Sequence, residues 1–182
     1  FFLQMRHGAD WPLGTASSAG TLTSAQEVVA AFTYDSAGGR VKQVTSTATT
    51  HYLGGLYEVE STAAGSAPAK QIFLGPMRVA TRRTGVNAGT FFSHPDHLGS
   101  TALLTNTKGE VAQRVEYLPF GSVWKNAGTI DLPQKFTGKP LDSTTGLYYY
   151  GARYYDPELG RWITPDPTIE NPFNPQTLNR YT

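Results

Sequence analysis

The chain has 182 residues, of which 39% are hydrophobic, 12% aromatic and 16% charged, and its formal net charge is +1. This is enough sequence for a domain with a real core, whereas the near-neutral charge gives no electrostatic reason to expect nucleic acid or an anionic membrane as a partner. Cysteine is absent, which excludes disulfides, thiolate metal ligands and a cysteine nucleophile, and no apolar run approaches the ~20 residues of a membrane-spanning helix.

The N-terminal part carries the one helical pattern. The opening FFLQMRHGADWPLG (1–14) lacks the charged start and apolar stretch of a signal peptide. TSAQEVVAAF (23–32) is helix-like, because Ser24 would cap a helix and Glu27 would complete a capping box. Thr and Val weaken this pattern, so a strand is the near-equal alternative. The chain starts without Met and stops at LNRYT, and we expect a fragment of a longer protein.

From residue 32 onward, short β-prone runs alternate with glycine-containing turn signals. The turn signals are DSAGGR (35–40), LGG (53–55), NTKGE (106–110), PFGS (119–122), TTGL (144–147) and PELGR (157–161). The runs between them are rich in Thr, Val, Tyr and Phe, as in RVKQVTSTATTHYL (40–53), EVAQRVEYL (110–118) and LYYYGARYY (147–155). Such runs between Gly, Asn, Asp and Pro turns predict successive β-hairpins.

Alternation within EVAQRVEY (110–117) supports a strand. It predicts one face formed by Val111, Gln113, Val115 and Tyr117, and an opposite face formed by Glu110, Ala112, Arg114 and Glu116. An irregular repeat is also present, in which an aromatic residue precedes the turn, Gly lies in it and a hydrophobic residue follows. It is seen in FTYDSAGGRVKQV (32–44), VEYLPFGSVWK (115–125) and RYYDPELGRWIT (153–164). Repeated units of this kind predict stacking into an extended sheet or solenoid.

HPDHLGS (94–100) contains imidazole, carboxylate and hydroxyl groups that could form a metal or catalytic site. In a strand, His94 and Asp96 share one face and His97 lies on the other, whereas zinc needs three or four converging ligands. A Ser100–His97 nucleophile is a further, weaker alternative. We expect no metal site here, and we expect Asp96 or His97 to bond turn amides near Gly99.

The stretch YYYGARYYDPELGRWITPDP (148–167) is interpreted first as structure. Gly151 permits a bulge or a close strand approach, Asp156-Pro157 opens a turn and Gly160 supplies a positive φ. Arg153 and Arg161 are expected to stack on rings or to pair with Asp142, Asp156 or Glu158. Tyr155 and Trp162 are expected to be largely buried. A carbohydrate platform, with Tyr149, Tyr154 and Trp162 as weak candidates, is the alternative.

Together these motifs resemble the tyrosine-aspartate (YD) repeat and the RHS repeat-associated core. YDSAGGR (34–40) resembles the first, and HPDHLGSTALLTNTKGEV (94–111), EYLPFG (116–121) and FTGKPLDSTTGLYYYGARYYDPELGRWITPDP (136–167) resemble the second. The resemblance covers roughly residues 32–182. The residues that match the motifs are Tyr34, Asp35, Gly39, Arg40, His94, Asp96, His97, Gly99, Pro119, Phe120, Gly121, Gly138, Gly146, Gly151, Arg153, Tyr155, Asp156, Pro157, Gly160 and Arg161.

The resemblance implies a mainly β fold, in which successive antiparallel hairpins form part of a spiral β-shell, the core segment lies near the C-terminal end of the shell and a variable toxin follows it in many members. It divides the chain into a poorly assigned segment (1–31), YD-repeat-like hairpins (32–93), the RHS core (94–167) and a Pro/Asn-rich tail (168–182). Some relatives free the toxin with an aspartate-dependent self-cleavage, in which two nearby carboxylates share a proton. Asp166 falls at the first Asp-Pro motif of that site, although Pro165 before it and TIENPFNPQ (168–176) after it depart from the pattern.

The sequence therefore predicts a structural shell segment that encloses or presents an effector in a secreted or cell-surface bacterial protein. Half of an aspartyl autoprotease and an adhesive or glycan-binding scaffold are the alternatives. The expected partners are the rest of its own shell, the effector, and a secretion-system or immunity protein. We expect no cofactor, no nucleic acid and no enzymatic activity of the fragment itself.

Overall fold

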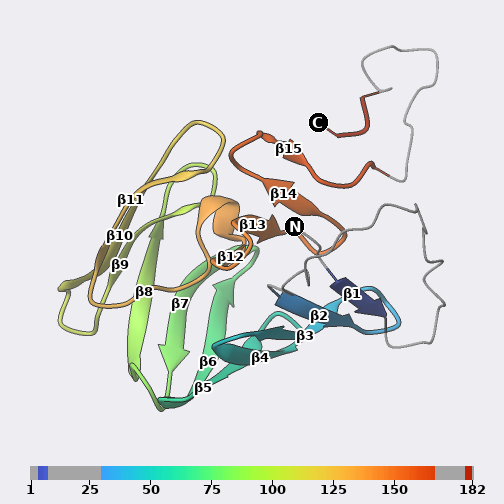
Figure 1. Cartoon of the computed structure of the whole chain (residues 1–182). Coiled ribbons are helices and arrows are strands. Elements are labelled where there is room, and N and C mark those ends of the chain that lie inside the picture. The colour runs from blue at the N-terminus through green and yellow to red at the C-terminus, as the bar shows by residue number, and fades with distance from the viewer. Residues whose placement is uncertain (1–3, 8–29, 167–178, 182) are drawn as a thin grey trace.

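The computed structural model describes residues 4–7, 30–166 and 179–181, which form two sheets (Figure 1). The large sheet has eleven strands that are neighbours in chain order. They are β1 (Gln4–His7), β2 (Ala30–Tyr34), β3 (Arg40–Thr45), β4 (Ala48–Leu53), β5 (Tyr57–Thr62), β6 (Gly65–Leu74), β7 (Met77–Arg83), β8 (Gly89–Pro95), β9 (Thr101–Thr105), β10 (Val111–Tyr117) and β11 (Val123–Gly128). All its neighbouring pairs are antiparallel except β1 and β2, which are parallel.

The small sheet follows after a 3-10 turn, η1 (Phe136–Gly138). Its four strands also lie in chain order and are antiparallel: β12 (Leu141–Asp142), β13 (Leu147–Tyr149), β14 (Tyr154–Asp156) and β15 (Arg161–Trp162). The prediction of a mainly β fold built from successive hairpins is confirmed. The described residues hold no helix long and apolar enough to cross a membrane.

The helix predicted at 23–32 is wrong where it can be checked. Residues 30–32 lie in β2, in register with β3, and Ala30 and Phe32 are buried on one face of the sheet. Residues 23–29, including Ser24 and Glu27, lie outside the described residues. Burial of alternate side chains outweighs local helix propensity in this segment.

Three hairpin turns share one local device. Asp35, Asp96 and Asn106 each use Oδ1 to accept backbone N–H groups from the second and fourth residues that follow, at 2.8–3.0 Å. In each turn the third residue is a glycine with φ between +80° and +82°, a conformation that other L-residues rarely adopt. This confirms the expected turn role of Asp96, and it explains the D-x-x-G and N-x-x-G signals by local hydrogen bonding.

The alternation predicted for 110–117 is only partly correct, because a β-bulge shifts the register between Val111 and Gln113. Val111 consequently faces solvent, whereas Ala112 is buried next to the buried Gln113. From Gln113 onward the predicted alternation holds, with Val115 buried and Arg114 and Glu116 exposed. A bulge places two residues opposite one and so reverses which side chains face the core.

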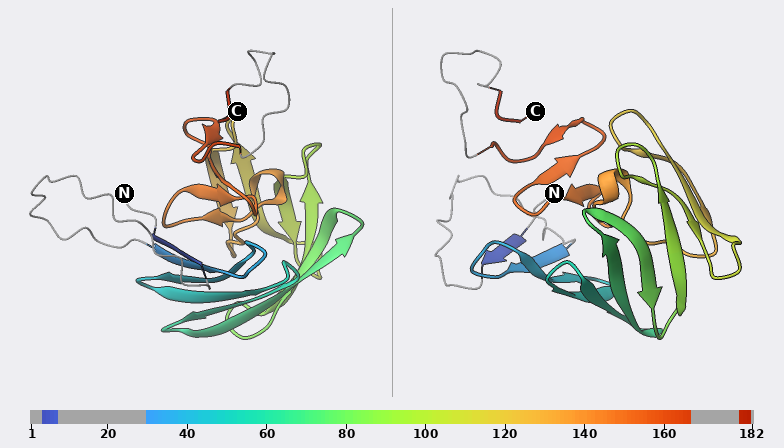
Figure 2. Two further views of the ribbon diagram at one scale, coloured as in Figure 1. Left: turned by 90° about the vertical axis from the view of Figure 1, so that its right-hand side faces the viewer. Right: turned by 180° about the vertical axis from the view of Figure 1, so that it is seen from behind.

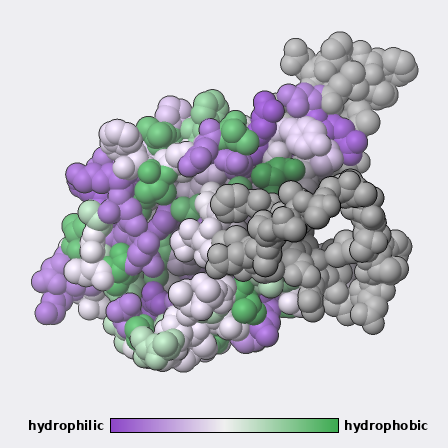
Figure 3. Space-filling model, in the orientation of Figure 1, coloured by the Kyte–Doolittle hydropathy of each residue, from purple (hydrophilic) through white to green (hydrophobic). Residues whose placement is uncertain are grey.

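The large sheet is strongly curved, and η1 and β12–β15 lie on its concave side (Figure 2). Two apolar clusters join the sheet to the chain that follows β11. One contains Ala30, Phe32 and Tyr34 of β2 with Tyr154 of β14. The other contains Phe91, Leu104 and Ala112 of the sheet with Leu132. The core therefore lies between the sheet and the chain that follows it. On the face of the molecule shown in Figure 3, hydrophobic and hydrophilic residues are interspersed.

Candidate functional site on the concave face

After β11 the chain folds back over the sheet instead of continuing it. We call residues 129–166 the crossing segment. It leaves beside β10, where Thr129 donates its N–H to the Ala112 carbonyl at 2.9 Å. It passes β9, where the Lys135 carbonyl accepts the Thr101 N–H at 3.0 Å. It reaches β2 at the other side of the sheet, where the Tyr34 and Tyr154 hydroxyls lie 2.7 Å apart. The segment thus spans most of the concave face.

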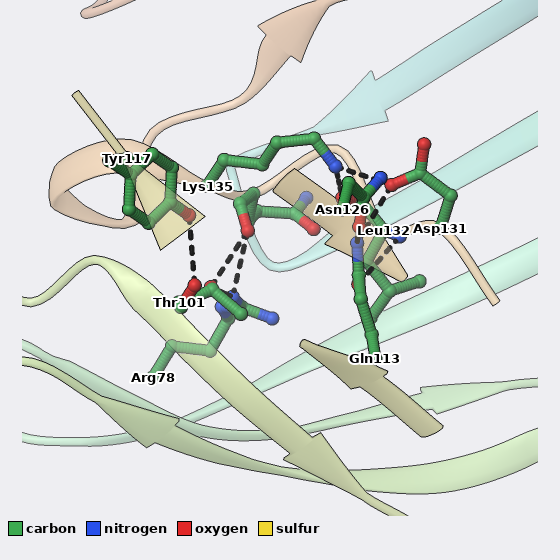
Figure 4. A network of polar contacts seen from close by, with 9 residues as sticks. Arg78, Thr101, Gln113, Tyr117, Asn126, Asp131, Leu132 and Lys135 are labelled. Atoms are coloured by element: carbon green, nitrogen blue, oxygen red, sulfur yellow. Dashed lines mark hydrogen bonds and ion pairs between the residues drawn. The ribbon is translucent and has the colours of Figure 1, made fainter. Parts of the chain in front are cut away.

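At β10 the crossing segment is held by the buried amide of Gln113 (Figure 4). Gln113 Nε2 donates to Asp131 at 2.8 Å and to Asn126 at 3.0 Å, and Gln113 Oε1 accepts the Leu132 N–H at 3.1 Å. Lys135 Nζ donates to the same Asp131 carboxylate and to the Leu132 carbonyl. A buried amide whose donors and acceptor are all used fixes one position of the segment.

In the middle of the sheet, Arg78 of β7 is buried and takes part in none of the ion pairs among the described residues. Its guanidinium donates to the hydroxyls of Thr81 at 2.9 Å and Thr101 at 2.7 Å, and to the Gln134 carbonyl at 3.4 Å. Burial lowers the pKa of Arg78 to about 10, although the nearby Glu58 carboxylate opposes the shift. Arg78 therefore remains a cation at neutral pH, and neutral oxygen atoms of the sheet and of the crossing segment solvate it.

At β3 the crossing segment is anchored by a buried ion pair. Arg40 Nη1 lies 2.7 Å from Asp142 Oδ2, and the two side chains are 1% and 4% exposed. The Arg40 guanidinium also lies 4.3 Å from the ring centre of Tyr149 and 4.6 Å from that of Tyr52. Burial alone would lower the pKa of Arg40, but the attraction of Asp142 outweighs it and the pKa is raised. The YD-repeat arginine is thus a charged contact between the repeat and the crossing segment.

A cavity of about 810 Å³ remains between the sheet and the crossing segment, and its wall includes Arg40, Tyr52, Glu58, Arg78 and Gln134. Glu58 accepts hydrogen bonds from the amides of Gln71 and Gln134 at 3.2–3.4 Å. Burial raises the pKa of Glu58 more than the Gln134 bond and nearby arginines lower it. The cavity wall therefore combines these polar and charged groups with apolar side chains such as Phe73, Met77 and Leu98.

The aromatic run of 148–155 is used mainly for packing. Tyr148 is fully buried and donates its hydroxyl to the Gly121 carbonyl at 2.9 Å. Tyr154 is 3% exposed, so it cannot stack on a sugar, and the platform interpretation is wrong for that ring. Tyr149 is half-buried, and its hydroxyl accepts the Arg40 N–H.

The expectation that Tyr155 and Trp162 would be largely buried is only partly confirmed. Both are half-buried and pack edge to face, with ring centres 5.5 Å apart, on the side of the small sheet away from the core cluster around Tyr154. Directly paired residues share a face, so Tyr148, Tyr155 and Trp162 lie on one side of the small sheet and Tyr149 and Tyr154 on the other. Tyr148 is buried on its side, where its ring packs against Phe136. Gly121, Gly151 and Gly160 have φ of +91°, +92° and +64°, which confirms their expected place at turns.

Arg153 stacks on a ring, which is one of the two expected alternatives, but it does not pair with the acids expected for it. Its Nη2 lies 3.0 Å from Asp166 Oδ2, and its guanidinium lies 4.1 Å from the ring centre of Trp162. Asp142, one of the expected acids, instead pairs with Arg40. The Asp166 backbone is held by Arg180, which accepts the Asp166 N–H at 2.7 Å and donates Nε to the Asp166 carbonyl at 2.5 Å. The predicted catalytic carboxylate thus lies in an ion pair at the end of the crossing segment.

HPDHLGS forms the β8–β9 turn. His94 bonds Thr105 Oγ1 through Nε2 at 2.9 Å, and the buried Ser100 Oγ accepts the Thr137 N–H at 3.1 Å. Within the described ranges no group of three or more His, Cys, Asp or Glu residues could hold a metal ion. The Asp96 turn and the Ser100 contact give this motif a structural use.

Reasoning from the sequence missed the polar anchors of the concave face: Glu58, Arg78, Gln113, Asp131, Gln134 and Lys135. One signal was present, since Arg78 and Gln113 are polar residues at core positions of β-prone runs. Their partners on the crossing segment are 18 to 56 residues away in the sequence, and spacing along the chain does not show such pairs. The domain division at 93/94 and the catalytic role assigned to Asp166 stay predictions.

Comparisons with known proteins agree with this architecture. The model of the family described as Teneurin YD-shell matches residues 82–182. Toxin subunit YenC2 of Yersinia entomophaga is 31% identical over 162 residues, which cover 75% of this chain and 16% of that protein. Double-stranded DNA deaminase toxin A of Burkholderia cenocepacia is 38% identical over 85 residues, 44% of this chain and 6% of that protein.

The fold recurs in a crystal structure of TcdB2-TccC3 without its hypervariable C-terminal region. The TM-score is 0.67 at 23% identity, over 84% of this chain and 8% of the other. At this identity the match shows a common fold. The chain spans between 6% and 16% of the length of these three proteins.

Proposed function

The chain belongs to the Teneurin YD-shell family, and we propose that it forms the C-terminal part of a β-shell that encloses or presents an effector in a secreted toxin protein. The observation that carries the proposal is the crossing segment. It turns the chain back over the concave face and holds it there through Gln113, Arg78 and the Arg40–Asp142 pair. The chain is thereby directed to the inner side of the sheet, where an enclosed effector would follow.

The relatives support an effector in this position. Two of them are named as toxins, and the TcdB2-TccC3 protein of similar fold has a hypervariable C-terminal region that was left out of its crystal structure. A constant shell followed by a variable region would let one scaffold carry different effectors. The partners under this proposal are the remaining shell, other toxin subunits, and a secretion-system or immunity protein.

The test is protection of the effector from protease in the full-length protein. We expect the region after residue 182 to resist a protease that rapidly digests the same region expressed alone. Asp142→Ala, which unpairs the buried Arg40, should shorten that protection, whereas the exposed strand substitution Glu116→Ala should not. Equal digestion of the wild-type effector in the full-length protein and alone would contradict the proposal.

A second candidate function is self-cleavage that releases the effector, and the Arg153–Asp166 pair favours it. The Arg153 guanidinium, 3.0 Å away, fixes the position of the Asp166 carboxylate, and a positioned carboxylate can act as a general base or activate water. A second acidic group would have to supply the proton to the leaving amine. Under this proposal that group lies after residue 182, as the family resemblance implies.

Comparing the full-length protein with the 182-residue chain tests whether self-cleavage occurs and whether it needs a group after residue 182. The chain alone should remain intact through purification and long incubation. Full-length protein should be cut downstream, and Asp166→Asn should abolish the cut without unfolding the shell, because the change is nearly isosteric. Asp156→Asn, in the β14–β15 turn, is the matched control. Normal cleavage with Asn at position 166 would refute the role of Asp166.

A further inference from the structure

The outer face of the large sheet, opposite the crossing segment, carries two adjacent rows of directly paired residues. Gln71, Thr81 and Phe91 are buried on the concave side, so their neighbours in β6, β7 and β8 face outward. One outward row runs through Leu53, Tyr57, Lys70, Arg82 and Thr90. The next runs through Ile72, Ala80, Phe92, Thr105 and Val111.

The first row places two cations directly opposite each other, Lys70 on β6 and Arg82 on β7. Both side chains are exposed, and the four ion pairs within residues 4–7, 30–166 and 179–181 involve neither. Like charges directly opposite on neighbouring strands are destabilising. Their repulsion would be relieved by an anion bound between them.

The charged residues of β2–β11 are sorted by face. Besides Lys70 and Arg82, the outer face carries Lys42, Arg114 and Lys125, through the pairs with His51, Leu103 and Glu116. Glu116 is its one acidic residue in these strands. The other two acids, Glu58 and Glu60, face inward, where they contact Gln134 and Arg83. The near-neutral chain therefore presents a basic outer face.

The second row gives this basic face an apolar component. Ile72 is 38%, Phe92 44% and Val111 54% exposed, and the 4% exposed Ala80 lies between the first two. Simple anions would bind the cations without contacting this row. Nucleic acid would need several flat rings for base stacking, whereas Phe92 is the one ring of this row and lies between Ala80 and Thr105.

We propose that the outer face around Lys70, Ile72, Arg82 and Phe92 binds an acidic stretch of polypeptide that carries apolar side chains. Its carboxylates would pair with Lys70 and Arg82, and its apolar groups would cover Ile72 and Phe92. Charge complementarity selects an acidic partner and sets the rate of encounter, while the adjacent apolar row selects a polypeptide over other polyanions. This site is separate from the concave face and from the proposed enclosure of an effector.

The test is binding of the folded 182-residue chain to a random copolymer of glutamate and tyrosine, followed by fluorescence anisotropy. Polyglutamate, oligothymidine and phosphatidylserine vesicles are compared in parallel at one ionic strength. We expect the copolymer to bind tightest. Lys70→Glu with Arg82→Glu should weaken this binding about tenfold, since two exposed pairs become repulsive.

The matched control is Lys108→Glu with Arg161→Glu, which reverses one exposed lysine and one exposed arginine outside this face. It should change copolymer binding by less than about twofold. Phe92→Ala should reduce copolymer binding towards that of polyglutamate. The proposal is overturned if both double variants weaken binding equally, if polyglutamate binds as tightly as the copolymer, or if oligothymidine or vesicles bind tighter.

Discussion

The buried ion pair between Arg40 and Asp142 gives the sharpest test of how the crossing segment is held. Replacing Asp142 by alanine leaves the Arg40 guanidinium, 1% exposed, without its carboxylate at 2.7 Å. Removing one partner of a buried pair costs about 3–5 kcal/mol, because the remaining charge stays desolvated. Stacking on Tyr149 and Tyr52 is worth up to about 2 kcal/mol and persists in the variant. We therefore expect a loss of about 3 kcal/mol.

Urea unfolding of the chain, followed by circular dichroism, measures this loss. Glu116→Ala, exposed on the outer face, should change the free energy of unfolding by less than about 0.5 kcal/mol. Arg40→Met combined with Asp142→Leu removes both charges and should recover most of the stability, because apolar replacement of a buried pair is often neutral. A loss below about 1 kcal/mol in Asp142→Ala, or a double variant less stable than the single one, would refute the reasoning.

Three further predictions use the same unfolding measurement. Trp162→Ala should cost about 1.5–2.5 kcal/mol, roughly half the value for a fully buried aromatic residue, and a loss above about 3 kcal/mol would contradict its half-buried position. Gly121→Ala should cost about 2–5 kcal/mol, since φ is +91° and a Cβ would lie 2.4 Å from the Phe136 ring. Gly146→Ala, at φ +73° in open space, should cost only about 1–2 kcal/mol; equal losses at the two glycines would exclude the steric contribution. Burial raises the pKa of Glu58 above its ordinary 4.5, so its protonated form favours folding at low pH and this stability is lost as pH rises through the folded-state pKa. Glu58→Gln should therefore be more stable than wild type at about pH 7 and equal to it near about pH 4, and the opposite trend would contradict the shift.

The sequence alone was sufficient for features that depend on neighbouring residues. The hairpins follow from β-prone runs between glycine turns, and the turn role of Asp96 follows from a side chain that bonds amides two and four residues ahead. The positive φ of Gly121, Gly151 and Gly160 is likewise a feature that the neighbouring residues determine. In each case the deciding interaction lies within a few residues, so the local pattern determines it.

Contacts between residues far apart in the sequence decided the remaining features, and local sequence patterns did not predict these contacts. Arg40 meets Asp142 across 102 residues, and Arg153 meets Asp166 rather than the acids nearer to it in the run. Strand alternation could not foresee the bulge that turns Val111 outward, and it could not tell which of the clustered tyrosines face the core. Which face of a strand is buried depends on what packs against it. Only the return of the crossing segment over the concave side determined that the inner charges would be held by ion pairs or hydrogen bonds and the outer cations left exposed.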